Sequence, residues 1–165
     1  MRGVGTQLKY YVRLINRGLW FCTNLGLGIL ILPPIISILK RLITGTGMTG
    51  TVEFSEYLLV AIGFLGLSYA QEIKGHIAVD IFYRLLGESF QRFMRLGGFL
   101  LSAGLAGVFT WLGFEKALHA SLDMETAWFG DIIVRVWFMR WVVPIGFLAL
   151  FLQCLVDMFE EVFRK

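Results

Sequence analysis

Residues 53–80 read EFSEYLLVAIGFLGLSYAQEIKGHIAVD, an apolar run that ends abruptly in a turn carrying His76 and, four residues later, Asp80. The run from Phe54 to Ile73 is about 20 residues long, which as a helix matches the roughly 30 Å hydrocarbon core of a bilayer. The acidic residues Glu53 and Glu56 fall in its first turns, where a helix N-terminus partly compensates a carboxylate. This stretch therefore predicts a membrane-spanning helix that ends at a membrane surface.

The composition of the whole chain also favours a bilayer as its solvent. Of 165 residues, 57% are hydrophobic, 15% aromatic and 16% charged, and the mean hydropathy is +0.72. A soluble domain of this size could not expose such a surface to water. Besides residues 54–73, three more apolar runs are long enough to span a bilayer, at residues 18–39, 96–118 and 137–159. We predict an all-α membrane protein in which residues 1–165 form a single integral membrane domain of four transmembrane helices.

The distribution of Lys and Arg predicts the orientation of this bundle. Most of the 15 lie in the N-terminal segment, in the connection between the second and third spans, and at the C-terminus. Because cytoplasmic segments carry an excess of Lys and Arg, both termini are expected in the cytoplasm. The first apolar run is too long for a cleavable signal peptide and is expected to remain as an anchor. Cys22 and Cys154 would then face the reducing side, so no disulfide is predicted.

Residues 77–93, between the second and third spans, are too apolar for a simple loop. Their charged residues recur every three or four positions, which places them on one helical face and leaves an apolar face for the membrane interface. We predict an amphipathic interfacial helix here, with an early start of the third span as the alternative. In either case three cationic side chains are expected at cytoplasmic headgroups: Arg84, Arg92 and Arg95.

Small residues indicate where helices could pack, because bilayer helices associate through close approach. Four positions are the candidates: Gly63, Gly98, Ser102 and Ala106. Contacts within the chain explain them as well as contacts with a second subunit.

Motifs of catalysis are missing from the sequence. It contains no Cys-x-x-Cys pair, His-Glu-x-x-His helix, phosphate-binding glycine loop or Gly-x-Ser-x-Gly elbow, so metal, nucleotide and acyl chemistry lack their minimum residues. The span interiors hold only a few weakly polar side chains, too few for an ion or proton path. We therefore expect no enzyme, no cofactor and no metal.

Two other classes of membrane protein need comparison. A membrane anchor of a respiratory or redox complex would also be small and four-spanned. However, His76 and His119 are expected at opposite ends of the bundle, which excludes a haem held by both. A self-assembling channel would require pore-lining polar residues that this chain mostly lacks.

The residues around the second span carry a specific resemblance. Glu53, then Gly66 thirteen residues later, then His76 and Asp80 resemble the second-helix signature of the small membrane subunit (DctQ/SiaQ-like) of tripartite ATP-independent periplasmic (TRAP) transporters. The chain length, the four spans, the amphipathic stretch after Asp80 and Pro144-x-Gly146 in the last span are similar to that family as well. The Pro33-Pro34 pair and the Gly- and Thr-rich residues 44–51 depart from it, so the first outer connection is expected to differ locally.

This resemblance implies a non-catalytic permease subunit in the inner membrane of a bacterium or archaeon. It would scaffold a larger, elevator-type membrane subunit at one-to-one stoichiometry and help a periplasmic substrate-binding protein to dock during sodium-coupled uptake of an organic acid. The phospholipid bilayer is the remaining partner, and no nucleic acid is expected. The solute stays open among sialic acid, C4-dicarboxylates, sulfonates and other organic acids, because this subunit would not bind it directly.

The signature residues are the candidates for contact with the larger subunit: Glu53, Gly66, His76, Asp80, Pro144 and Gly146. Local roles explain three of them equally well. Glu53 could cap its helix, Asp80 could pair with Arg84, and His76 could be a turn residue exposed to headgroups.

Charged residues expected on the outer surface are candidates for docking the binding protein, although simple solvation is the alternative for most of them. They are Lys40, Arg41, Glu115, Lys116, Asp123, Glu125, Asp131, Arg135 and Arg140.

Overall fold

The computed structural model describes residues 2–73 and 87–163. The elements in chain order are α1 (Arg2–Leu30), α2 (Leu32–Thr44), α3 (Thr51–Glu72), α5 (Glu88–Leu122), β1 (Thr126–Phe129), β2 (Ile132–Arg135), the short 3-10 helix η1 (Trp137–Trp141) and α6 (Val142–Phe163). Four helical stretches are long and apolar enough to cross a membrane: Lys9–Thr44, Thr51–Glu72, Phe90–Leu122 and Trp137–Val162. The prediction of four membrane-spanning helices is therefore confirmed.

The helices are longer than the predicted spans at most of their ends. α5 begins at Glu88, eight residues before the predicted start at residue 96. The last residues of the expected interfacial helix at 77–93 therefore belong to α5, and most of that helix lies outside the described residues. His76, Asp80 and Arg84 lie outside them too.

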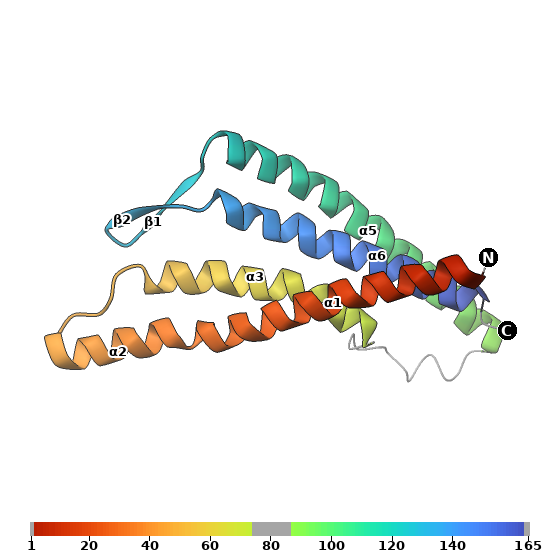
Figure 1. Ribbon diagram of the computed structural model, residues 1–165, viewed down its shortest axis with the longest axis horizontal. Coiled ribbons are helices and arrows are strands. Elements are labelled where there is room, and N and C mark those ends of the chain that lie inside the picture. The colour runs from red at the N-terminus through yellow and green to blue at the C-terminus, as the bar shows by residue number, and fades with distance from the viewer. Residues whose placement is uncertain (1, 74–86, 164–165) are drawn as a thin grey trace.

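α1 and α2 together form one long rod along the bundle (Figure 1). Pro33 and Pro34 lie in the first turn of α2, where the missing proline N–H groups would have no helical partner in any case. The stretch Lys9–Thr44 has 36 residues, about 54 Å of helix at 1.5 Å per residue, which well exceeds a hydrocarbon core of roughly 30 Å. α2 ends at Thr44, and the following Gly45 has φ +77° and donates its N–H to Arg41 O at 2.9 Å. The rod must therefore extend past the hydrocarbon core.

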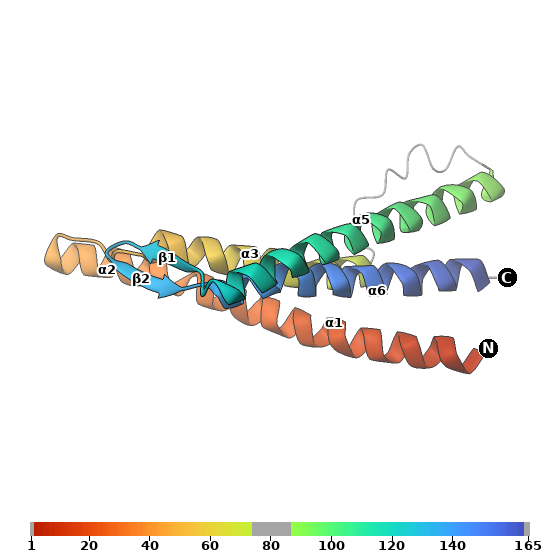
Figure 2. The ribbon, with the colours of Figure 1, turned by 90° about the horizontal axis from the view of Figure 1, so that it is seen from above.

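The helices pack as two pairs, α1 with α3 and α5 with α6, and α6 also packs against α3. Figure 1 shows both chain termini at one end of the bundle, which we call the termini end, and the β1–β2 hairpin at the other, the hairpin end. Figure 2 shows α6 between α5 and α1 towards the termini end. Successive spanning helices therefore run in opposite directions.

Small residues occupy the points where these helices approach most closely. A Cβ built on Gly146 of α6 would collide with the backbone O of Phe64 in α3, and its distance to the Phe64 carbonyl carbon would be 2.7 Å. Gly66 of α3 lies against Thr23 of α1, and Gly113 of α5 against Pro144 of α6, with Cβ distances of 3.5 and 3.3 Å. Close approach of this kind is how helices associate in a bilayer, where water does not drive burial.

Large apolar side chains lie mainly on the outside of the bundle. Leu100 and Leu101 on α5 are 65% and 66% exposed, and Ile43 on α2 is 84% exposed. Such a surface is stable in hydrocarbon and unstable in water.

The hairpin is an element that our sequence analysis did not predict. Its strands are antiparallel, with Phe129 opposite Ile132 and Trp128 opposite Ile133, and residues 130 and 131 form the turn between them. Gly130 has φ +60°, as the first central residue of a type II′ turn requires. Gly-Asp between two short runs of aromatic and β-branched residues was the signal available in the sequence.

Candidate interaction sites at the two ends of the bundle

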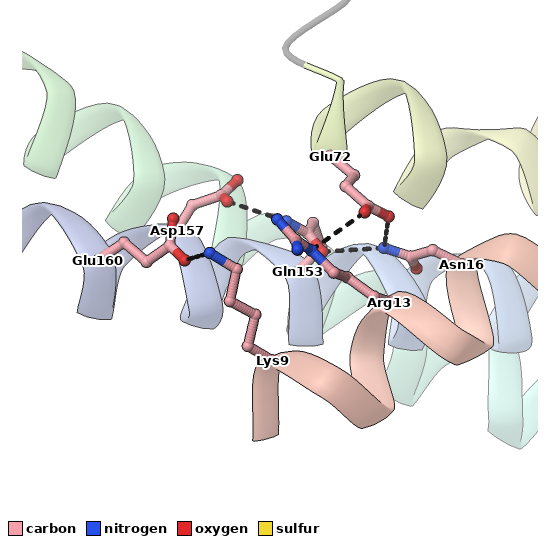
Figure 3. Close-up of polar contacts among 7 residues, drawn as sticks. All are labelled: Lys9, Arg13, Asn16, Glu72, Gln153, Asp157 and Glu160. Atoms are coloured by element: carbon pink, nitrogen blue, oxygen red, sulfur yellow. Dashed lines mark hydrogen bonds and ion pairs between the residues drawn. The ribbon is translucent and has the colours of Figure 1, made fainter. Parts of the chain in front are cut away.

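A buried asparagine connects three helices near the termini end. Asn16 of α1 is fully buried. Its Nδ2 donates to Glu72 Oε2 of α3 and to Gln153 Oε1 of α6, both at 2.9 Å (Figure 3). One side chain therefore links α1, α3 and α6.

Further hydrogen bonds extend this link along α6. Gln153 Nε2 donates to Asp157 Oδ1 at 2.9 Å, and Gln71 Nε2 of α3 donates to Asp157 Oδ2 at 2.9 Å. We call Asn16, Gln71, Glu72, Gln153 and Asp157 the Asn16 cluster. Because buried polar groups are costly without partners, such a network fixes which turn of one helix meets which turn of the next.

Cations of α1 border the Asn16 cluster. Arg13 Nε lies 3.5 Å from Glu72 Oε1, and Lys9 Nζ pairs with Glu160 of α6. Figure 3 shows both cations projecting from α1 towards α3 and α6. Glu72 and Glu160 are thus each paired with a cation of α1.

Two of the three arginines that we predicted to contact headgroups, Arg92 and Arg95, also form contacts within the chain. Arg95 Nε pairs with Glu161 Oε1 at 2.8 Å. Arg92 Nη2 donates to the backbone O of Val162 at 2.8 Å, near the end of α6, where the helix carbonyls lack helical donors. These arginines connect α5 to the C-terminal end of α6, and their contact with headgroups stays a prediction.

At the other end, the hairpin packs against the start of α3. The N–H of Gly130 donates to Glu53 Oε1 at 3.4 Å, and the rings of Phe129 and Tyr57 stack with centroids 5.5 Å apart. A Cβ on Gly130 would lie 2.5 Å from Thr49 Cβ, so the turn touches the α2–α3 loop directly. Glu53, expected to contact a partner or cap its helix, thus accepts a hydrogen bond from the hairpin of its own chain.

An ion pair connects the residue that precedes β1 with the helix η1 that follows β2. Arg140 of η1 donates two hydrogen bonds to the Glu125 carboxylate, from Nε at 2.8 Å and from Nη2. The Arg140 hydrogen bond holds the pKa of Glu125 below its usual range, and the Arg140 charge acts in the same direction. Nearby, Trp141 Nε1 donates to Ser121 Oγ at 2.9 Å and connects η1 to α5.

The same ion pair forms one wall of a pocket of about 290 Å³ at the hairpin end. We call this cavity the Lys116 pocket. It is lined by Lys116, Ala120, Asp123, Glu125 and Arg140. Four of the nine predicted docking charges therefore lie together. The other five are distributed over α2, α5 and the hairpin, with Lys40 and Arg41 in α2, Glu115 in α5, Asp131 in the turn and Arg135 in β2.

The remaining signature and packing residues divide into two groups. Gly66, Pro144, Gly146 and Ala106 face neighbours in their own chain, and the last three of these are buried. Gly63, Gly98 and Ser102 are exposed, and nothing lies within 4 Å of a Cβ built on either glycine. The first group thus packs against neighbours in the same chain, and the second group leaves its helix surface open.

Our expectation that the spans hold only weakly polar side chains needs correction. The Asn16 cluster places two carboxylates and three amides between helices, because the middle of α1, the last turn of α3 and the second half of α6 meet in space. Gln153 and Asp157, four residues apart on one face of an apolar run, were the signal in the sequence.

These features define a class before any comparison. The chain is a polytopic α-helical membrane protein whose helices are joined by hydrogen bonds and ion pairs between polar side chains. Within the described residues, no group of three or more His, Cys, Asp or Glu side chains could hold a metal ion.

The family is established by comparison with known proteins. Residues 30–164 match the family described as Tripartite ATP-independent periplasmic transporters, DctQ component, and the chain belongs to this family. A curated relative is the C4-dicarboxylate TRAP transporter small permease protein DctQ of Pseudomonas aeruginosa, 28% identical over 110 residues that cover 64% of this chain and 51% of that protein. The chain thus spans about half the length of the relative it matches. The resemblance found in the sequence is confirmed, and proteins of this family are transporter components and not enzymes.

Proposed function

We propose that this chain is the small permease subunit of a TRAP transporter in the inner membrane and that it acts as a fixed scaffold for the large membrane subunit. The observation that carries this proposal is the Asn16 cluster. Its amides and carboxylates bind one another across α1, α3 and α6, so the strongest polar groups between the helices serve to hold the bundle together. A rigid bundle is what a static subunit needs if a neighbouring subunit moves.

The proposed orientation places the termini end in the cytoplasm. Lys9, Arg13, Arg92 and Arg95 lie at that end, and cytoplasmic membrane flanks are rich in Lys and Arg. The hairpin end would then face the periplasm.

The proposed contact with the large subunit uses the small residues that the chain leaves open. Gly63 on α3 and Gly98 on α5 have no neighbour within 4 Å of a built Cβ, and Ser102 lies one turn from Gly98. Small residues let a foreign helix approach a backbone closely. We propose one copy of the large subunit for each copy of this chain.

The proposed docking of the periplasmic binding protein uses the charges farthest along the hairpin end. Lys40 and Arg41 lie near the end of α2, Asp131 lies at the hairpin turn, and Arg135 is exposed on β2. Exposed charges of this kind guide a soluble partner to a surface more than they increase its affinity. The assembled transporter would take up an organic acid coupled to sodium.

Purification from the native membrane tests the scaffold. A tagged chain should bring down a large multi-span permease at one-to-one stoichiometry. Gly63→Leu and Gly98→Leu should lower the yield of that permease, while Gly28→Leu, at a similarly open glycine on α1, should leave it unchanged. Recovery of redox subunits, or of this chain alone, would overturn the proposal.

A further inference from the structure

One face of α5 carries an ordered series of side chains towards the hairpin end. The residues Leu105, Phe109, Leu112, Lys116, Ala120 and Asp123 follow each other at spacings of three or four, so they lie along one helical face. The three apolar members are 52%, 47% and 48% exposed, and Lys116 and Asp123 are exposed as well. From the centre of the bundle towards the hairpin end, this face therefore presents apolar side chains first, then the cation Lys116, and finally the anion Asp123.

The polar part of this face borders the Lys116 pocket. Ala120, which is 8% exposed, lies between the two charges along the helix, and the ion-paired Glu125 and Arg140 also line the pocket. Among residues 2–73 and 87–163, neither Lys116 nor Asp123 has an ion-pair partner. Lys116 lies six residues before the end of the apolar stretch Phe90–Leu122, where a long cationic side chain reaches the headgroup region and can bind an anionic group there.

Aromatic rings place the pocket at the depth of the headgroups. Phe114 and Trp141 meet edge to face at 5.4 Å, and Trp137 and Phe138 meet at 6.1 Å. Trp137 and Trp141 are of the amphipathic type that gathers at membrane–water interfaces, and they lie on either side of Arg140, which lines the pocket. A ligand in this pocket would therefore have its polar part at the interface and its apolar part along Leu105, Phe109 and Leu112.

The order of the charges selects the ligand. We propose that this face of α5 binds one phospholipid whose headgroup carries a phosphate and a terminal ammonium, of the phosphatidylethanolamine type. Lys116 lies nearer the bilayer centre and Asp123 about 10 Å farther out along the helix. In such a lipid the phosphate is next to the glycerol and the ammonium is outermost, so Lys116 binds the phosphate and Asp123 the ammonium. An anionic lipid without an amine would leave Asp123 facing a headgroup that gives it no counter-charge.

Native mass spectrometry of the complex purified in mild detergent tests this proposal. The complex would be titrated with phosphatidylethanolamine, phosphatidylglycerol and phosphatidylcholine. The wild type should prefer phosphatidylethanolamine. Lys116→Gln should weaken both phosphatidylethanolamine and phosphatidylglycerol, by about fivefold for one partly exposed charge contact. Asp123→Asn should leave phosphatidylglycerol unchanged and weaken phosphatidylethanolamine more than phosphatidylcholine, because a primary ammonium donates hydrogen bonds to the carboxylate and a choline nitrogen cannot. The preference for phosphatidylethanolamine should therefore disappear.

A matched control is Glu115→Gln, one residue before Lys116 on α5 and exposed, which should change no lipid affinity. Because Lys116 and Asp123 are also exposed, their variants are expected to fold, and an unchanged elution profile checks this. Equal binding of all three lipids, unaffected by either variant, would overturn the site. So would a loss of binding-protein affinity in Lys116→Gln with lipid binding unchanged.

Discussion

Asn16→Leu should destabilise the bundle, because Asn16 is the side chain that links three helices. The substitution keeps roughly the same volume in a fully buried position and removes the two hydrogen bonds at 2.9 Å to Glu72 and Gln153. Interhelical hydrogen bonds in membrane proteins contribute about 0.6 kcal/mol on average and about 1.7 kcal/mol at most. Two such bonds predict a loss of about 1 to 3 kcal/mol in the free energy of unfolding.

The matched control is Asn24→Leu on the same helix. Asn24 is exposed and, among residues 2–73 and 87–163, donates to Trp20 O of its own helix alone, at 2.8 Å, so its replacement should change stability by less than about 0.5 kcal/mol. Both variants would be unfolded reversibly in mixed micelles of mild detergent and dodecyl sulfate, and followed by tryptophan fluorescence and circular dichroism.

Equal stability of Asn16→Leu and Asn24→Leu would refute the role of the Asn16 cluster. A double-mutant cycle with Gln153→Leu tests the same reasoning at the level of one contact. It should give a coupling energy of about 0.6 kcal/mol between Asn16 and Gln153, and a coupling of zero would mean that the two amides do not interact.

The remaining predictions concern the helix crossing and the hairpin end. Gly146→Ala should separate α3 from α6 and lower the melting temperature, because the added Cβ would collide with the Phe64 carbonyl. Gly63→Ala is the control and should leave the melting temperature unchanged, because nothing lies within 4 Å of a Cβ built there. Equal melting temperatures of the two variants would contradict the close crossing of α3 and α6. Glu125→Gln should lower stability at neutral pH, where the carboxylate that Arg140 binds is charged. Since this contact lowers the pKa of Glu125 from its usual 4.5, its contribution is fully present above that value and is lost as the pH falls through the lower folded pKa. Melting temperatures of wild type and Glu125→Gln should therefore converge at acid pH, and a constant difference would contradict the assignment.

Much of the fold could be predicted from local sequence. Hydrophobic length is a property of consecutive residues, so four apolar runs sufficed to predict four spanning helices. The signature Glu53, Gly66, His76 and Asp80 indicated the family, which the match over residues 30–164 confirms. The hairpin also had a local signal, Gly130-Asp131 between two short apolar strands.

Contacts between distant residues could not be predicted in this way. Asn16 is separated by 56 residues from Glu72 and by 137 from Gln153, and neither spacing has a periodic signature. Glu53 illustrates the same limit, because its hydrogen-bond donor, Gly130, is 77 residues away. The sequence by itself determined the number and length of the helices, since a bilayer requires each helix to satisfy its own backbone. Only the tertiary structure decided which polar groups meet between them, because that depends on helix register and crossing, which close packing of small residues sets.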